Sequence, residues 1–152
     1  MQGGPLPDSA LPPVTHASHH VFSWPVRVYW EDTDAGGVVY HASYLRFLER
    51  ARTEHLRALG IEQERLRADN TVFVVRDMQI DFVKPARLDD MLAVTVALAE
   101  RRKASLVFTQ RILRTADDAV LVEARVRAAC LEAASFRPRP IPQGLFVEIA
   151  DA

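Results

Sequence analysis

An α+β fold is predicted for this 152-residue chain from three features of its sequence. One long segment, from Tyr44 to Leu59, has apolar residues at spacings of three and four, which is typical of an amphipathic helix. Segments that alternate apolar and polar residues follow it, and the short connections between successive strands predict antiparallel hairpins. One helix packed on one curved antiparallel sheet is the simplest arrangement that buries both apolar faces.

The individual elements follow from local patterns. A first strand is expected over 26–30, and the helix is expected to stop at Gly60, because glycine suits the position after a helix end. A short second helix is expected within 61–70. Further strands are expected over 72–82, 91–100, 105–114 and 119–131, with a turn at 115–118. Pro85 ends the first of these because proline cannot donate a ladder hydrogen bond.

Composition divides the chain into three parts. Residues 1–20 are rich in glycine and proline and are expected to form a disordered leader. His16, His19 and His20 crowd its end; a metal site is one reading, and a solvated tail is preferred because no cysteine or acidic partner stands at ligand spacing. The folded domain is expected over 21–134, and residues 135–152 are expected to form a C-terminal tail.

Charge and hydropathy argue against several classes of protein. Nineteen basic and twenty acidic residues give a net charge of −1, which does not favour nucleic-acid binding. No apolar run approaches the roughly 20 residues that span a bilayer, and the N-terminus lacks a signal-peptide pattern. A cytoplasmic protein without a transmembrane segment is therefore expected. The single cysteine, Cys130, lies in an apolar strand pattern, which favours a core residue over a nucleophile.

The acidic turn at 31–37, Glu-Asp-Thr-Asp-Ala-Gly-Gly, carries the strongest functional signal. A carboxylate at this place lies near the positive end of the helix dipole, beside unpaired backbone N–H groups. Such N–H groups can stabilise a developing oxyanion while the carboxylate attacks the substrate or deprotonates water. The turn therefore favours hydrolysis of an acyl compound. The alternative is a solvated turn whose charges only stabilise the helix start.

The stretch from Tyr29 to Tyr44, followed by Phe47, Glu49 and Arg52, resembles the signature of hot-dog-fold acyl-CoA thioesterases of the 4-hydroxybenzoyl-CoA thioesterase superfamily. It is most similar to the bacterial Tol–Pal-associated acyl-CoA thioesterases, whose pattern the segment 83–90 also matches. The resemblance covers about residues 24 to 132. It implies a hot-dog fold, in which a curved sheet wraps a central helix and chains pair into homodimers or homotetramers. No metal or organic cofactor is expected.

The resemblance also implies roles for particular residues. Asp34 matches the catalytic carboxylate, as nucleophile or general base, while Glu31 and Asp32 are weaker candidates. His41 matches the position whose backbone N–H polarises the thioester carbonyl, and a further contact from its imidazole stays open. The hydroxybenzoyl branch has tyrosine at this position, so that specificity is not expected here. The substrate-binding residues around His41 are expected to include Tyr40 and Ser43.

A basic cluster, Arg101, Arg102 and Lys103, lies between two strand patterns and is expected at a hairpin tip. Composition alone favours a solvated turn. The resemblance instead places basic residues of this hairpin against the nucleotide phosphates of coenzyme A, a contact that suits arginine and lysine.

The expected function is hydrolysis of an acyl-CoA thioester to a free acid and coenzyme A. One alternative is a hydratase or dehydratase on the same fold, which would need the His41 imidazole to work as an acid or base with Asp34. Another is a non-enzymatic binder of acyl-CoA or of acyl carrier protein. Acyl carrier protein is also expected as a further partner of the enzyme.

Overall fold

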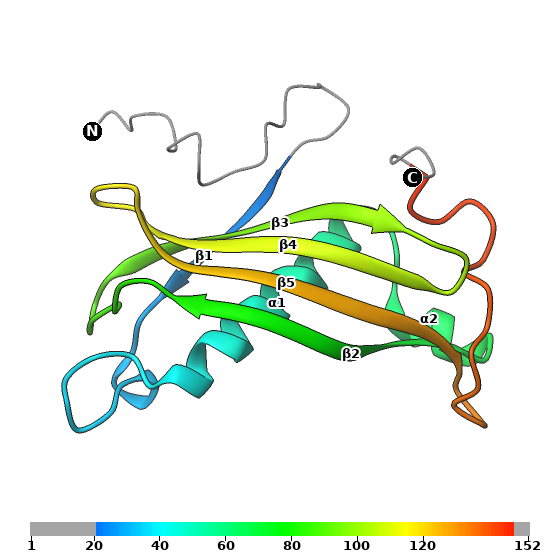
Figure 1. Ribbon diagram of the computed structural model, residues 1–152, viewed down its shortest axis with the longest axis horizontal. Coiled ribbons are helices and arrows are strands. Elements are labelled where there is room, and N and C mark those ends of the chain that lie inside the picture. The colour runs from blue at the N-terminus through cyan, green and yellow to red at the C-terminus, as the bar shows by residue number, and fades with distance from the viewer. Residues whose placement is uncertain (1–20, 148–152) are drawn as a thin grey trace.

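One long helix lies against a five-stranded antiparallel sheet in the computed structural model, which describes residues 21–147 (Figure 1). The strands, in the spatial order β1-β3-β4-β5-β2, are β1 (Phe22–Arg27), β2 (Thr71–Phe82), β3 (Met91–Arg101), β4 (Ser105–Arg114) and β5 (Ala119–Glu132). The helices are the 3-10 turn η1 (Trp30–Asp32), α1 (His41–Ala58) and α2 (Gln63–Ala68). The predicted α+β architecture is confirmed.

The predicted hairpins are correct for two connections and wrong for the third. Strands β3 and β4 pair directly, as do β4 and β5, and each pair is joined by a short turn. Strands β2 and β3 follow each other in sequence, but β4 and β5 separate them in the sheet. Residues 83–90, which we name the crossover loop, therefore cross from one side of the sheet to the other.

The first strand lies earlier in the chain than the sequence predicts. Strand β1 ends at Arg27, and Trp30 belongs to η1 instead of the strand. The cause is the buried carboxylate of Asp32, whose Oδ2 accepts a hydrogen bond of 2.8 Å from the backbone N–H of Tyr29. This bond turns the chain out of the sheet, toward the acidic turn and α1.

The apolar stripe of α1 faces the sheet as predicted except at its end, where Ala58 and Leu59 are exposed. Tyr44, Phe47, Leu48 and Ala51 are buried, and the helix packs against β1 and β3. Gly60 follows the helix with a φ of +81°, a backbone conformation that favours glycine because side chains with a Cβ are strained there. The predicted helix stop is therefore confirmed.

The segment after β5 packs back onto the domain. Ile141 and Phe146 are almost fully buried, and the ring of Phe146 meets that of Phe73 edge to face at 5.7 Å between centroids. Cys130 is buried as expected, and burial raises the pKa of its thiol, which makes it a poor nucleophile.

Two expectations, the disordered leader at 1–20 and the metal site at its histidines His16, His19 and His20, concern residues that lie outside the described part of the chain.

Within residues 21–147, no helix is both long enough and apolar enough to cross a membrane.

We predict that Phe47→Ala lowers the free energy of unfolding by about 3–5 kcal/mol, because it leaves a cavity where α1 meets the sheet. Leu45→Ala is the matched control on the same helix, since Leu45 is 41% exposed, and it should cost less than about 1 kcal/mol. Urea denaturation of both variants measures the difference. Equal losses would mean that the stripe does not anchor α1.

Candidate active site

Asp34 lies on a closed turn that leads into α1. The turn is held by the Asp34 N–H bonded to the Val38 carbonyl at 2.9 Å and by the Gly37 N–H bonded to the Asp34 carbonyl at 3.0 Å. The side chain of Asp34 is exposed, and its Oδ1 accepts a 2.8 Å hydrogen bond from the N–H of Gly36. Its second carboxylate oxygen has no hydrogen-bond partner among the described residues, so it is available to a ligand.

The neighbouring acids lie differently. Asp32 is 6% exposed and its carboxylate is engaged with the Tyr29 N–H, while its carbonyl accepts the Tyr40 N–H at 2.8 Å. Asp32 thus has a structural part in fixing the turn to the helix start. Glu31 is exposed, without a side-chain hydrogen bond or ion pair to the described residues. Of the three acids, Asp34 alone sits at the tip of the turn beside the glycines.

The first turn of α1 lacks a cap. Tyr40 is the N-cap residue, but no side chain caps the helix, and its first turn contains no acidic residue. The N–H of Ser43 bonds to the Tyr40 carbonyl at 2.8 Å, whereas those of His41 and Ala42 have no partner within residues 21–147. These donors, at the positive end of the helix dipole, can bind an anionic oxygen.

Aromatic rings surround the helix start. The exposed His41 imidazole lies against Tyr40, at 4.5 Å between ring centroids, and edge-on to Phe82, at 6.3 Å. Phe82, at the end of β2, is 48% exposed and also contacts the ring of Tyr44. Tyr40, His41 and Phe82 therefore form a partly open aromatic wall beside the free N–H groups.

Ser43 lies inward from this wall. Its side chain is 1% exposed, and its Oγ accepts a 2.9 Å hydrogen bond from Arg46. Contact between substrate and this hydroxyl stays a prediction, whereas Tyr40 and His41 are accessible.

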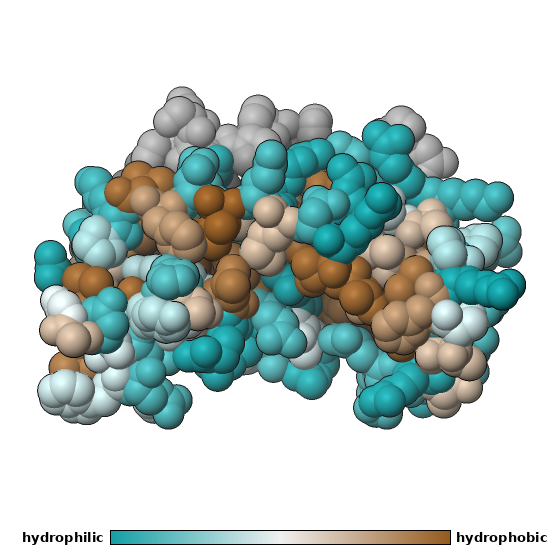
Figure 2. Space-filling view, turned by 60° about the horizontal axis from the view of Figure 1, so that its bottom comes forward, coloured by the Kyte–Doolittle hydropathy of each residue, from teal (hydrophilic) through white to brown (hydrophobic). Residues whose placement is uncertain are grey.

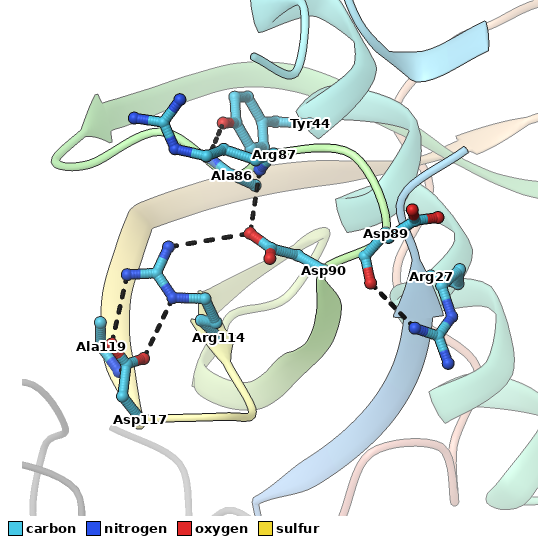
Figure 3. A network of polar contacts seen from close by, with 9 residues as sticks. All are labelled: Arg27, Tyr44, Ala86, Arg87, Asp89, Asp90, Arg114, Asp117 and Ala119. Atoms are coloured by element: carbon cyan, nitrogen blue, oxygen red, sulfur yellow. Dashed lines mark hydrogen bonds and ion pairs between the residues drawn. The ribbon is translucent and has the colours of Figure 1, made fainter. Parts of the chain in front are cut away.

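The crossover loop is bonded to the start of α1 (Figure 3). The Ala86 N–H donates to the hydroxyl oxygen of Tyr44 at 2.9 Å, and the Ala86 carbonyl accepts from Val39 N–H at 2.9 Å. Burial raises the pKa of Tyr44; the bond from Ala86 opposes this, and the negative charges of Asp34 and Asp90 add to it. The charge of Asp34 thus acts on Tyr44, which lies at the bottom of the same site.

A second set of contacts holds the crossover loop from the other side. The Asp90 Oδ2 accepts the N–H of Arg87 at 2.9 Å and lies 3.7 Å from Nη1 of Arg114. Arg114 is also paired with Asp117 at 3.1 Å, in the hairpin between β4 and β5. Figure 3 shows this network running from the β4–β5 turn to Tyr44. The break at 85–90 is visible in the sequence, whereas these contacts are not, because they join segments that are distant along the chain.

The predicted basic cluster lies at the opposite end of the sheet. Arg101 ends β3 and Arg102 and Lys103 follow in the turn to β4, so the predicted hairpin position is correct. Arg101 Nε donates to the Leu145 carbonyl at 2.9 Å, and Arg102 pairs with Glu100 at 3.2 Å. The hairpin and the acidic turn lie at opposite ends of the molecule (Figure 1). The 11 residues of β3, which run between these ends, span about 33 Å when extended.

A metal centre has no support in the geometry of this site. Residues 21–147 contain no group of three or more histidine, cysteine, aspartate or glutamate side chains placed to hold a metal ion. The arrangement is instead that of an exposed carboxylate beside free backbone donors, which suits attack on a carbonyl group.

Comparison with known proteins agrees with this geometry. The model of the thioesterase-like superfamily matches residues 28–148. The acyl-CoA thioester hydrolase YbgC of Escherichia coli O6:H1 is 51% identical over 128 residues, which cover 84% of this chain and 95% of that protein. The acyl-CoA thioesterase YbgC of Haemophilus influenzae is 46% identical over 123 residues, 80% of this chain and 89% of that protein.

Solved structures of thioesterases superpose on this chain. A probable thioesterase from Bartonella henselae superposes with a TM-score of 0.74 at 37% identity, over 82% of this chain and 99% of that one. The 1,4-dihydroxy-2-naphthoyl-CoA thioesterase Slr0204 from Synechocystis shares the fold, with a TM-score of 0.79 at 22% identity over 87% and 97% of the two chains. The chain therefore belongs to the thioesterase-like superfamily with the hot-dog fold, in the family of the YbgC acyl-CoA thioesterases.

Proposed function

We propose that this protein hydrolyses acyl-CoA thioesters to a free carboxylic acid and coenzyme A. One observation carries this proposal: the exposed carboxylate of Asp34 lies on the turn that leads directly into the uncapped start of α1. The family relationship to acyl-CoA thioester hydrolases supports the same reaction and substrate class.

The proposed chemistry assigns the two groups different parts. The N–H of His41 or Ala42 binds the thioester oxygen, on which negative charge develops during attack, and the helix dipole favours that charge. Asp34 either attacks the carbonyl carbon to form a mixed anhydride, which water then hydrolyses, or removes a proton from the attacking water. In both routes the C–S bond breaks and coenzyme A leaves as the thiolate.

Two other functions remain as alternatives. A hydratase or dehydratase would need the His41 imidazole as a proton carrier, and a non-enzymatic binder would hold acyl-CoA without turnover. A free-thiol assay on a panel of acyl-CoA substrates separates them, because only hydrolysis releases the coenzyme A thiol.

The position of the basic hairpin argues for a site shared between two chains. About 21 bonds join the coenzyme A sulfur to its most distant phosphate, on the 3′ oxygen of the ribose, an extended reach of about 25 Å at ~1.2 Å per bond. This is shorter than the extended length of β3, about 33 Å, and the hairpin of Arg101, Arg102 and Lys103 lies at the end of β3 away from the acidic turn. If these basic residues bind the phosphates, they do so for the site of a second chain.

The free edge of β2 offers the place for that second chain. Strand β2 has 12 residues and, within residues 21–147, pairs on one side only, whereas the other edge strand, β1, is shorter and contains Pro25. Val75 and Phe82 on β2 are 43% and 48% exposed, and Figure 2 shows apolar side chains in a broken band on the side that carries α1 and β2. Antiparallel pairing of two β2 strands would bring the partner's basic hairpin toward Asp34.

Other expectations stay predictions. They are the assembly of dimers into tetramers, the acyl carrier protein partner, the cytoplasmic location and the association with the Tol–Pal system.

We predict that Asp34→Asn lowers kcat for acyl-CoA hydrolysis at least about 100-fold, because it removes the nucleophile or base. Glu31→Gln, the same change on a neighbouring exposed acid, should keep kcat within about threefold, the range of a minor surface effect. Both rates come from the free-thiol assay, with circular dichroism to verify folding. Near-parental turnover by the Asp34 variant would remove Asp34 from the reaction.

The shared site predicts complementation between two defective chains. One chain carries Asp34→Asn, and the other carries Arg101→Ala, Arg102→Ala and Lys103→Ala, which should raise KM more than it lowers kcat. Co-expression creates mixed dimers in which one site combines an intact Asp34 with an intact hairpin. Activity with the parental KM should therefore reappear.

The contrary result is equally clear. If only the high-KM activity of the hairpin variant is seen in co-expressed protein that light scattering shows to be dimeric, the hairpin does not serve the partner's site. A 17.1 kDa species at micromolar concentration would mean that the chain does not dimerise at all.

A further inference from the structure

A cavity of ≈ 210 Å³ lies between the middle of α1 and the part of the sheet formed by β2, β4 and β5, and Asp34 does not line it. Phenylalanine rings from three separate segments line it: Phe73, Phe108 and Phe146. Phe146, from the segment after β5, is 2% exposed and packs on Phe73. The polar part of the lining includes Glu49 and Arg52 of α1.

The guanidinium of Arg52 is held in this wall by a buried glutamine. Gln110 on β4 is 2% exposed, and its Nε2 donates to the carbonyls of Leu48 at 3.1 Å and Thr95 at 3.4 Å. With its amide nitrogen occupied in this way, the Oε1 of Gln110 faces Arg52 and accepts a 2.9 Å bond from Nη1. The fold thus fixes the direction of the cation.

Arg52 has a neutral hydrogen-bond partner and, in the described part of the chain, no carboxylate partner, unlike Arg111 and Arg114. Arg111 and Arg114 each form an ion pair with a carboxylate, but Arg52 has none within 4.0 Å among residues 21–147. Its Nε and Nη2 also have no hydrogen-bond partner in that part of the chain. Burial lowers the pKa of Arg52, and the negative charge of Glu49 partly offsets this.

Arg52 is only partly buried and its unpartnered N–H groups are not enclosed by protein, so a ligand in the cavity can accept hydrogen bonds from them. Carboxylates match the planar fork of a guanidinium and can accept two parallel bonds from it. The aromatic lining would exclude water from an apolar group attached to that carboxylate.

We propose that this cavity binds a small apolar carboxylic acid, with the carboxylate on the free N–H groups of Arg52 and the hydrocarbon part against the phenylalanine rings. This is a second site, because the 11 positions from His41 to Arg52 correspond to about 16 Å along α1. It goes beyond the proposed hydrolysis, although the acid belongs to the chemical class that this reaction releases.

Calorimetric titration of the full chain with octanoate tests the proposal. Octanoate should bind saturably with one molecule per chain, whereas octan-1-ol, which lacks the charge, and acetate, which lacks the apolar body, should bind at least about 10-fold more weakly. Equal binding of octanol and octanoate would overturn the role of Arg52.

Two substitutions of opposite effect sharpen the test. Arg52→Met should weaken octanoate binding by about 10-fold or more, the range for a charge-assisted hydrogen bond. Glu49→Gln removes a competing negative charge from the lining and should tighten binding by about two- to fivefold. Arg50→Gln is the control, because Arg50 is exposed on the same helix and does not line the cavity.

Asp34→Asn separates this proposal from the proposed hydrolysis. That variant should bind octanoate as the parent does, whether or not it hydrolyses acyl-CoA. Loss of binding in Asp34→Asn, or parental binding in Arg52→Met, would place the acid elsewhere and overturn the proposal. If Arg52→Met fails to fold, Glu49→Gln still decides, since unchanged or weaker octanoate binding by it contradicts the proposal.

Discussion

The hydrogen bond from the Ala86 N–H to the Tyr44 hydroxyl is the contact on which the geometry of the candidate site depends. Tyr44 is buried on α1, so the bond joins the crossover loop to the buried face of that helix. The carbonyl of Ala86 in turn accepts the N–H of Val39, which precedes the helix. Because a buried N–H without a partner costs about 1–3 kcal/mol, this bond also holds the loop in one position.

The acidic turn gains its position from the same contacts. Val39 also forms a bridge with Thr33, next to Asp34, while the carbonyl of Asp32 accepts the N–H of Tyr40. The carboxylate and the free N–H groups of α1 therefore belong to one bonded unit. Preorganised groups of this kind stabilise developing charge without reorganisation during the reaction. The ion pair of Asp90 and Arg114 extends this unit to the β4–β5 hairpin.

Local patterns were enough to predict the fold, and contacts between distant segments explain what was missed. The spacing of Tyr44, Phe47 and Ala51 predicts α1, because helical periodicity is a local property. Asp32 and Asp34 are an exception: the bond from the Tyr29 N–H that distinguishes Asp32 joins residues only three apart, but residue type and spacing do not show which carboxylate forms it. Likewise, only the sheet order reveals that the basic hairpin and the acidic turn lie at opposite ends.

The most direct test of this account is the kcat of Tyr44→Phe for acyl-CoA. Tyr29→Phe is the matched control, because it makes the same change at a residue that is 62% exposed. Loss of the acceptor for Ala86 should lower kcat about 10- to 100-fold through misplaced groups. KM should change much less, and thermal unfolding should show that the variant remains folded. Tyr29→Phe should match the parent. A folded Tyr44→Phe enzyme with parental kcat would contradict the claim that this bond positions the site.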